Sequence, residues 1–420
     1  MATRILALRV LERRTLGRQA QLVAAMAPII ERGSEMRFAA KMKDEGNGTM
    51  RRWAGQAFTG ISVLALCFAT GCNGFFVYPG STSSGGAGNV LPASSGSPYA
   101  AGSAVDALAV DKTGNYLLAA AFGGSSDLMM YTFDSTIAGK LNLSASAKTG
   151  VTDPTGPVAV AAGTYVYVAN ATASTLSGFS LSPGALTPVA NSPYTLPFLP
   201  TSVVVNPANT FLYVGTSAAI YGYSIGAGGA LTPLNAVIVP AQSMDISPDG
   251  QWLVVLDANG QSIDEFQISL TTGILSQGPT TLYSNSAMTP REIKIAPNGA
   301  YLFVALGTGG DLVYTFNTAA TSGALTNPLT LPAPTSPLSD NALAVSPDSS
   351  TLYIARSNST SAGTVAAYSI GSGGSLTFSA QGTTGVQPYS VVLNAAGTHV
   401  YVANRSDGTI SGFSTTATKP

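Results

Sequence analysis

The side chains of this chain best suited to chemistry are a few carboxylates and guanidinium groups. Asp245 and Glu292 each lie in a short run of apolar residues, and Arg291 directly precedes Glu292. Two carboxylates that face one cavity can serve as a general base or bind a cation. An arginine beside them can hold a carboxylate or phosphate. The alternative is a hydrated wall on which these groups do no chemistry.

Other catalytic chemistries find little support in the sequence. The chain has one histidine, His399, and two cysteines. His399 occupies a position that is aromatic in the related segments described below, which favours a packing or surface role. With so few His and Cys residues, Cys/His catalysis and most zinc sites are excluded. No phosphate-binding loop, dinucleotide fingerprint or calcium-loop spacing is present, so we expect neither a metal nor a cofactor.

Charge divides the chain into two unlike parts. Residues 1–52 carry eleven Lys or Arg and five Asp or Glu, whereas the rest of the chain carries eight and fifteen. An acidic main part excludes nucleic-acid binding, which requires a basic surface. With 46 Gly, 25 Pro and only 9% charged residues, the chain is typical of an all-β protein with many turns.

The segment before residue 73 has the layout of an export signal. Two arginines follow Met50, and an apolar stretch too short to span a bilayer runs from Ala57 to Ala69. Ala69-Thr-Gly-Cys72 resembles the bacterial lipobox, in which the cysteine is acylated. We therefore expect residues 50–71 to be a lipoprotein signal peptide and Cys72 to be the lipidation site.

This interpretation assigns roles to the neighbouring segments. Residues 1–49 are either a wrongly assigned start or an extended basic region, and residues 72–89, rich in Gly and Ser, form a flexible tether. The protein is then exported and held at a membrane by its lipid, on the periplasmic face or at the cell surface. Its partner there is the membrane.

Seven similar units occupy residues 90–420. Each contains a small residue, one further residue, usually an aromatic residue, and then an apolar run. The units begin this pattern at Gly114, Gly163, Asn209, Gly250, Gly299, Ser349 and Gly397. Four short strands in a unit of about 45 residues are typical of a propeller blade. The sequence thus predicts an all-β, seven-bladed β-propeller of four-stranded antiparallel blades.

The last unit is incomplete, since too few residues follow Phe413 to form a fourth strand. The missing strand has a counterpart near the start of the propeller. Val90–Tyr99 is similar to the segment Leu186–Tyr194 of the second unit. We therefore expect an N-terminal strand to complete the last blade and leave no unpaired edge.

The propeller prediction places the charged residues. First strands line the channel of a propeller, so Asp245 and Glu292 should face it. Arg291 precedes a first strand, and Arg356 and Arg405 are expected just after second strands, on the same face of the disc. These three arginines could bind an anionic ligand, or they could be scattered solubilising charges. Asp264 and Glu265, in a third strand, are expected to face solvent.

Two motifs give the chain a family resemblance. Tyr167-Val-Ala-Asn170 and Tyr401-Val-Ala-Asn404 resemble the YVTN-type propeller repeat, and Pro290–Val304 resembles the lactonase propellers, which include 6-phosphogluconolactonase. In that family, blades often begin Pro-Arg-His or Pro-His-Ser. Here Arg291 fits the pattern, while Glu292 and Tyr389 stand at the histidine positions. The resemblance implies a lactonase-type cavity with Tyr389 among its ligand-binding residues.

Two functions stay open at this point. One is a monomeric cell-envelope propeller that binds or scaffolds, without a catalytic constellation, whose partner is a small anionic ligand or an envelope protein. The other, implied by the family resemblance, is a hydrolase acting on a sugar lactone or another lactone. Water would attack the lactone, with Glu292 or Asp245 as base and Arg291 holding the anionic group of the substrate. Whether the protein is an enzyme therefore stays open.

Overall fold

The computed structural model describes residues 89–123, 126–150, 157–257, 262–283, 289–317, 325–331, 334, 338–358 and 360–416. The predicted signal peptide, the lipidation site Cys72 and all of the tether except Asn89 lie outside these residues. No helix within the described ranges is long and apolar enough to cross a membrane.

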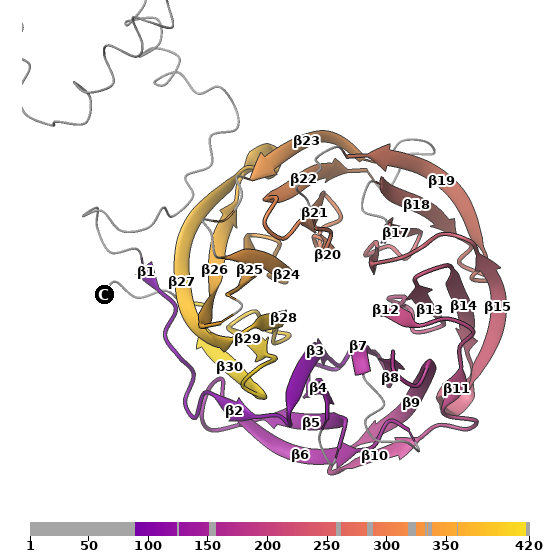
Figure 1. Cartoon of the computed structure of the whole chain (residues 1–420), viewed down its shortest axis with the longest axis horizontal. Coiled ribbons are helices and arrows are strands. Elements are labelled where there is room, and N and C mark those ends of the chain that lie inside the picture. Colours follow the sequence, from indigo (N-terminus) through magenta and orange to yellow (C-terminus); the bar gives the residue numbers. More distant parts are fainter. Residues whose placement is uncertain are drawn as a thin grey trace, which may run out of the picture. The chain divides into compact units, whose positions relative to one another are not determined.

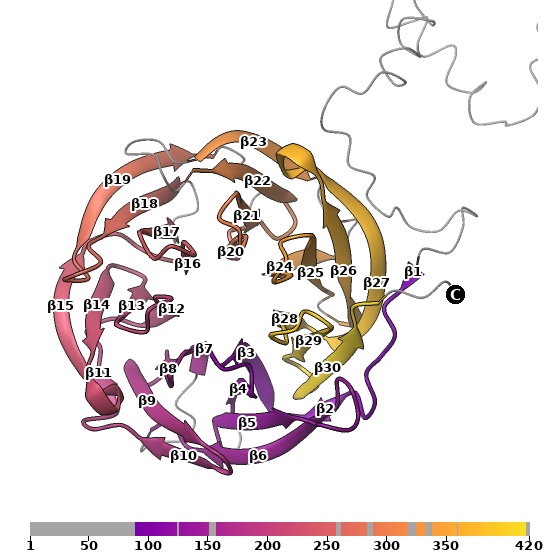
Figure 2. The ribbon, with the colours of Figure 1, turned by 180° about the vertical axis from the view of Figure 1, so that it is seen from behind.

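Seven four-stranded antiparallel blades surround a central channel, as the sequence predicted (Figures 1 and 2). The first strands are β3 (Ala104–Val110), β7 (Pro157–Ala162), β12 (Pro200–Val205), β16 (Ser243–Ile246), β20 (Glu292–Ile295), β24 (Ser339–Val345) and β28 (Pro388–Leu393). The second strands are β4 (Tyr116–Phe122), β8 (Tyr165–Asn170), β13 (Phe211–Thr216), β17 (Trp252–Leu256), β21 (Tyr301–Ala305), β25 (Thr351–Ser357) and β29 (His399–Asn404).

The third strands are β5 (Leu128–Phe133), β9 (Thr175–Ser182), β14 (Ile220–Ile225), β18 (Ser262–Ile268), β22 (Asp311–Phe316), β26 (Ala362–Ile370) and β30 (Thr409–Ser414). The outer strands are β6 (Leu141–Ala147), β10 (Ala185–Pro188), β15 (Leu231–Val237), β19 (Leu275–Leu282), β23 (Leu325–Leu331), β27 (Leu376–Val386) and β2 (Tyr99–Ala100). Two short strands, β1 (Asn89–Val90) and β11 (Tyr194–Thr195), and two 3-10 turns, η1 (Ala227–Gly229) and η2 (Ser372–Gly374), are additional.

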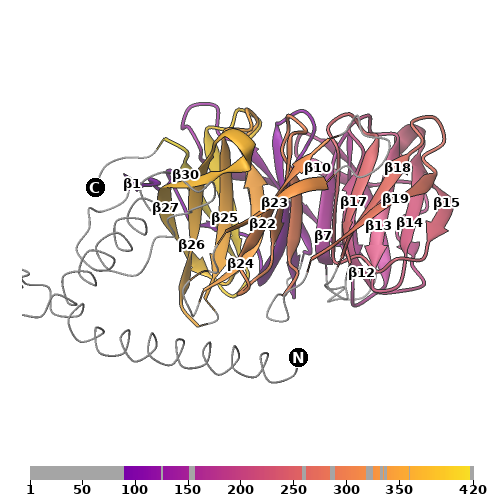
Figure 3. The same ribbon diagram turned by 90° about the horizontal axis from the view of Figure 1, so that it is seen from above.

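The strands run between the two faces of the disc (Figure 3). Because successive strands are antiparallel, connections from fourth to first strands and from second to third strands lie on one face, which we call the cavity face. Connections from first to second and from third to fourth strands lie on the opposite face. Arg291 and Arg405 are both on the cavity face, as expected.

Apolar clusters fill the space between neighbouring blades. Between the fourth and fifth blades, for example, Trp252 and Val254 belong to one buried cluster with Ile293 and Leu302. Both sides of each middle strand are therefore covered, and the centres of the second strands are runs of apolar residues instead of alternating apolar and polar ones. This packing stabilises a disc that has no single central core.

The same packing corrects one expectation about the third strands. Asp264 and Glu265 on β18 do not face solvent but are 7% and 0% exposed. Asp264 accepts hydrogen bonds from the hydroxyls of Thr280, at 2.6 Å, and Ser262, at 3.2 Å. A third strand in a propeller still lies between two neighbouring blades, which an isolated strand pattern does not reveal.

The N-terminal segment closes the last blade, which confirms the prediction. Strand β2 pairs antiparallel with β30, and the Ser94 N–H donates to the Gly412 carbonyl at 2.8 Å. In the second blade, the Val189 N–H donates to the Gly178 carbonyl in the same way, at 3.0 Å. The equivalent segments of the sequence therefore form equivalent edges.

One part of this closure was not predicted. Strand β1 pairs in parallel with β27, the outer strand of the sixth blade. The N–H of Leu91 extends this pairing to the Gln381 carbonyl at 2.9 Å. The N-terminal segment thus joins the sixth blade to the seventh in addition to completing the seventh.

Candidate functional site

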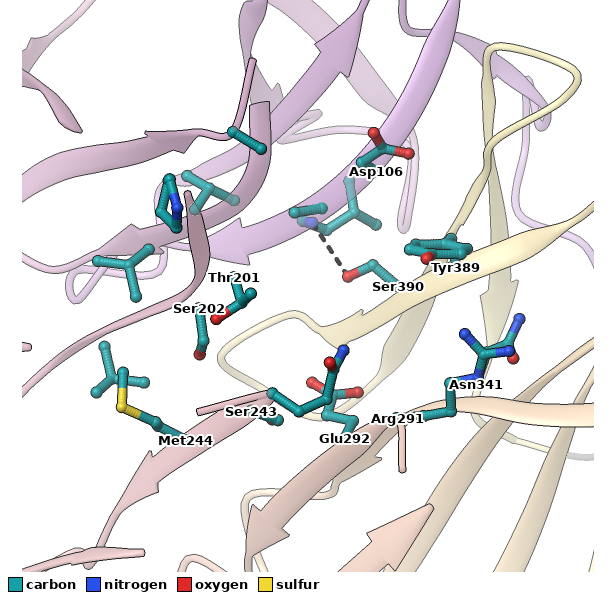
Figure 4. A pocket seen from close by; sticks show the side chains of 18 of the residues that line it. Asp106, Thr201, Ser202, Ser243, Met244, Arg291, Glu292, Asn341, Tyr389 and Ser390 are labelled. Atoms are coloured by element: carbon teal, nitrogen blue, oxygen red, sulfur yellow. Dashed lines mark hydrogen bonds between the residues drawn. The ribbon is translucent and has the colours of Figure 1, made fainter. Parts of the chain in front are cut away.

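A cavity of about 490 Å³ lies at the centre of the cavity face, where the first strands converge (Figure 4). Its volume is within the range of small-molecule sites, roughly 300–1,000 Å³. Every blade contributes described residues to its wall. The charged lining residues are Asp106, Arg291, Glu292, Lys294 and Arg405.

One ring of the wall is made of residues at equivalent positions in the blades. Pairing of first with second strands is interrupted at Asp106, Thr201, Asn341 and Tyr389. Each of these residues stands four positions before the last residue of its first strand, and Arg291 occupies the same position in the fifth blade. A bulge leaves its extra residue unpaired and changes the direction of its side chain. The interrupted ladders therefore place varied side chains around one opening.

Arg291 is the cation among these five ring residues. Its backbone N–H donates to the Ala305 carbonyl at 2.9 Å, which fixes the residue at the start of β20. Its Nε is buried, and no described group accepts a hydrogen bond from it. A guanidinium group in a cavity with a free donor is suited to binding a carboxylate or phosphate of a ligand.

Glu292 and Lys294 form an ion pair on the cavity wall. Lys294 Nζ lies 3.7 Å from Glu292 Oε1, and the Glu292 Oε2 accepts the Leu343 N–H of the next blade at 2.7 Å. Burial raises the pKa of Glu292, and Lys294 opposes this effect. Burial alone would lower the pKa of Lys294, but the negative charges of Asp245 and Glu292 raise it overall.

Asp245 is close to this pair but does not line the cavity. Its Oδ2 accepts the Ile295 N–H at 2.8 Å, and its Oδ1 accepts the Ile246 N–H at 3.0 Å. The carboxylate thereby joins β16 to β20 and supplies negative charge beside Lys294. The structure thus gives Asp245 a positioning role between two blades.

Asp106 on β3 forms the second ion pair of the cavity. Arg405 Nε lies 2.7 Å from Asp106 Oδ1, and the Arg405 guanidinium lies over the ring of Tyr389 at 5.0 Å. Burial raises the pKa of Asp106 to about 6, although the charge of Arg405 opposes the shift. A carboxyl group that titrates near neutral pH is suited to general-base chemistry.

Arg356 is the predicted site residue that the structure separates from the others. It belongs to β25 itself, is 1% exposed and does not line the cavity. Its Nε lies 2.7 Å from Asp340 Oδ1, and its Nη2 donates to the Tyr368 hydroxyl at 2.8 Å. The predicted cluster of three arginines is therefore reduced to Arg291 and Arg405.

A second carboxyl group accompanies this buried pair. Asp311 on β22 is 2% exposed, and no described donor makes a well-aligned hydrogen bond to either of its oxygens. Burial, followed by the charge of Asp340, raises the pKa of Asp311 well above its usual value. With two carboxyl groups beside one arginine, this shift favours the protonated form of Asp311.

The described residues contain no group of three or more His, Cys, Asp and Glu side chains that could hold a metal ion. His399, at the start of β29, is partly buried, and burial lowers its pKa. It lies at the end of its blade away from the cavity face.

Sequence reasoning placed Arg291, Glu292, Tyr389 and Arg405 in one region, and all four line the cavity. It missed Asp106 and Lys294. Asp106 belongs to the first blade and Arg405 to the last, so only closure of the ring brings them together. Lys294 stands two residues after Glu292 in the same first strand. Because alternate residues of a strand point to the same side, this spacing could have predicted that Lys294 also lines the cavity.

Comparison with known proteins supports the architecture. The family model described as Lactonase, 7-bladed beta-propeller matches residues 100–289 and 307–419. No curated protein matches the chain significantly.

Several solved structures share the fold. A candidate 6-phosphogluconolactonase from Bacteroides fragilis is 20% identical with a TM-score of 0.59, over 71% of this chain and 89% of the other. A periplasmic gluconolactonase from Pseudomonas aeruginosa is 16% identical with a TM-score of 0.56, over 72% and 96%. Hydrazine synthase from Kuenenia stuttgartiensis is 17% identical with a TM-score of 0.57, over 81% and 100%. At these identities, the likeness shows the fold alone.

Proposed function

Because the chain belongs to the seven-bladed β-propeller lactonase family, we propose that it hydrolyses a lactone that carries an anionic group and binds in the central cavity. The observation that carries this proposal is that one cavity holds both a group that can bind an anion and a group that can accept a proton. Arg291 offers a buried donor without a described acceptor, and Asp106 is a carboxyl group that titrates near neutral pH. One can hold an anion while the other accepts a proton.

In this mechanism Asp106 acts as general base. Its carboxylate takes a proton from a water molecule, whose oxygen forms a bond to the lactone carbonyl carbon. The bond between that carbon and the ring oxygen then breaks. The Lys294 ammonium group, which lines the same cavity, protonates the departing oxygen, and the product is a hydroxy acid. Arg291 holds the separate anionic group and so orients the ring.

Binding without turnover is the second candidate function, favoured by a different observation. The other charged lining groups already have partners, since Asp106 is paired with Arg405 and Glu292 with Lys294. A site with one free cation and two satisfied ion pairs can capture an anion without further chemistry. The protein would then be a binding or scaffolding module of the cell envelope.

Hydrolysis assays distinguish the two functions. The purified protein is tested on aldonolactones with and without a phosphate group, with acid release followed in a pH-stat. Asp106→Asn should lower kcat about 10²–10⁴-fold and remove an acidic limb near pH 6 from the profile of kcat/KM. Arg291→Ala should raise KM for the phosphorylated lactone and leave KM for the uncharged one unchanged.

Lys140→Ala is the matched control, because Lys140 pairs with Asp134 on the opposite face, away from the cavity. It should behave as the unaltered protein. If no lactone is hydrolysed but anionic ligands still raise the melting temperature in an Arg291-dependent manner, the hydrolase is refuted and the binding function holds.

A further inference from the structure

The wall of the cavity has two halves of different polarity. All five charged lining residues come from the first, fifth and seventh blades. The described lining residues of the second, third and fourth blades carry no charge. They are Val160, Ala171, Leu199, Pro200, Thr201, Ser202, Val203, Val204, Ser217, Gln242, Ser243 and Met244. Figure 4 shows Met244, Thr201 and Ser202 across the opening from Asp106 and Tyr389.

Part of the polar character of the uncharged half is already used within the protein. The Thr201 hydroxyl donates to the Ala241 carbonyl, and the Ser243 hydroxyl accepts the Ile293 N–H at 3.2 Å. Leu199, in contrast, keeps an apolar side chain that is 55% exposed, beside Phe198 at 46%. These two residues lie in the connection from β11 to β12, and Leu199 lines the cavity.

We infer that the ligand is an amphiphile, with its anionic group at the charged half of the wall and an aliphatic substituent of several carbons against the half made by the second, third and fourth blades. This inference rests on the proposed function for the location of the anionic group and adds the class of ligand. A fully hydroxylated sugar acid would place hydroxyl groups against apolar side chains of this half, such as Leu199. An alkyl chain instead removes apolar wall from water, including Leu199.

Binding of a homologous series tests the inference. The purified protein is titrated calorimetrically with linear carboxylates from acetate to octanoate, at concentrations below micelle formation. Each methylene that becomes buried should strengthen binding by up to about fourfold. γ-Lactones with alkyl substituents of increasing length, assayed for hydrolysis, should show a parallel rise in kcat/KM.

Two leucines of equal exposure provide a matched pair of variants. Leu199 is 55% exposed at the cavity edge, and Leu270 is 56% exposed in the connection from β18 to β19 on the opposite face. Neither substitution by serine removes a buried core residue. Leu199→Ser should weaken octanoate binding several-fold with little effect on acetate, whereas Leu270→Ser should change neither.

The outcomes separate the inference from the proposed function. Equal affinity for acetate and octanoate overturns the inference, even if lactones are hydrolysed. Chain-length-dependent binding without hydrolysis supports the inference and refutes the hydrolase. If affinity increases from acetate to octanoate as much in Leu199→Ser as in Leu270→Ser, the alkyl chain binds elsewhere. That result overturns the assignment to this wall.

Discussion

Replacing Asp311 with asparagine should raise the free energy of unfolding relative to the unaltered protein, and this gain should increase as the pH rises. Asp311 and Asp340 are both buried beside Arg356, and the ion pair that Arg356 makes with Asp340, at 2.7 Å, accounts for only one negative charge. Burial and the neighbouring Asp340 raise the pKa of Asp311 well above its usual value. Asparagine has nearly the shape of the protonated acid but cannot ionise.

The sign of the effect follows from proton binding. The folded protein holds a proton on Asp311 at pH values where the unfolded chain, with a pKa near 3.8, has released it. The stability contributed by this group is therefore complete at low pH and is lost as the pH rises towards the folded pKa. One such proton changes the free energy of unfolding by roughly 1 kcal/mol for each pH unit. The difference between Asp311→Asn and the unaltered protein should grow by about that amount per unit above pH 4, until the pH reaches the folded pKa of Asp311.

Urea unfolding at a series of pH values from 5 to 8 measures this difference. Comparing two proteins that differ at one residue cancels the contributions of titrating groups away from this site, such as Glu292 and Asp106. Asp340→Asn provides the contrast at pH 5, since it leaves a buried arginine without its paired carboxylate and should cost about 3–5 kcal/mol. A difference between Asp311→Asn and the unaltered protein that stays constant from pH 5 to pH 8 would refute a retained proton on Asp311.

Two further predictions concern the N-terminal region. Removing residues 89–100 takes away the burial of Leu91 and Tyr99, which are 2% and 8% exposed, and leaves the edge of β30 unpaired. The loss of about 4 kcal/mol should lower the melting temperature by at least about 5 °C. Removal of residues 73–85 is the control and should leave the melting temperature unchanged. Equal melting temperatures for the two truncated proteins would contradict the role of β2. We also propose that Cys72 carries the lipid anchor, so Cys72→Ser should move the protein from the membrane fraction to the soluble fraction and leave the leader uncleaved. Mass spectrometry of the mature N-terminus checks this, and an unmodified Cys72 would contradict it.

The number of blades and their closure could be predicted because local sequence patterns indicate both. Each blade repeats the same turn and apolar strand, and the segment before Tyr99 repeats the one before Tyr194. The two tyrosines make equivalent hydrogen bonds, to the carbonyls of Ser95 and Ala190. The parallel pairing of β1 with β27 has no repeated counterpart, and for that reason no pattern indicated it.

The prediction for Arg356 was wrong because its position in the repeat differs by one residue from that of Arg405. Aligned on their second strands, the sixth and seventh units place Arg356 opposite Asn404, one residue before Arg405. Asn404 is completely buried, as is Asn170 at the same position in the second blade. Side chains at this position point between blades, whereas Arg405 follows the end of its strand and reaches the cavity. A complete alignment of the units would have shown this difference.

The same alignment contains the candidate site. Asp106, Thr201, Arg291, Asn341 and Tyr389 share one column, although their chemistry differs. Position in the repeat determines that these residues face the opening. Which of them pair with one another depends on the distance around the ring, and the link between Asp106 and Arg405 exists only in the closed disc.

The closure of the seventh blade also orders events during synthesis. Ser97 accepts a hydrogen bond from Gly412, a residue 315 positions later in the chain. At about 5–20 residues per second, a ribosome needs roughly 15–60 seconds to make the intervening polypeptide. Throughout that time β2 has no partner, because β30 has not yet been made, and the stack of blades is not closed. The newborn protein can therefore reach its final form only after its last strand has been made, and before that point it has unpaired strand edges of the kind that can pair with other chains.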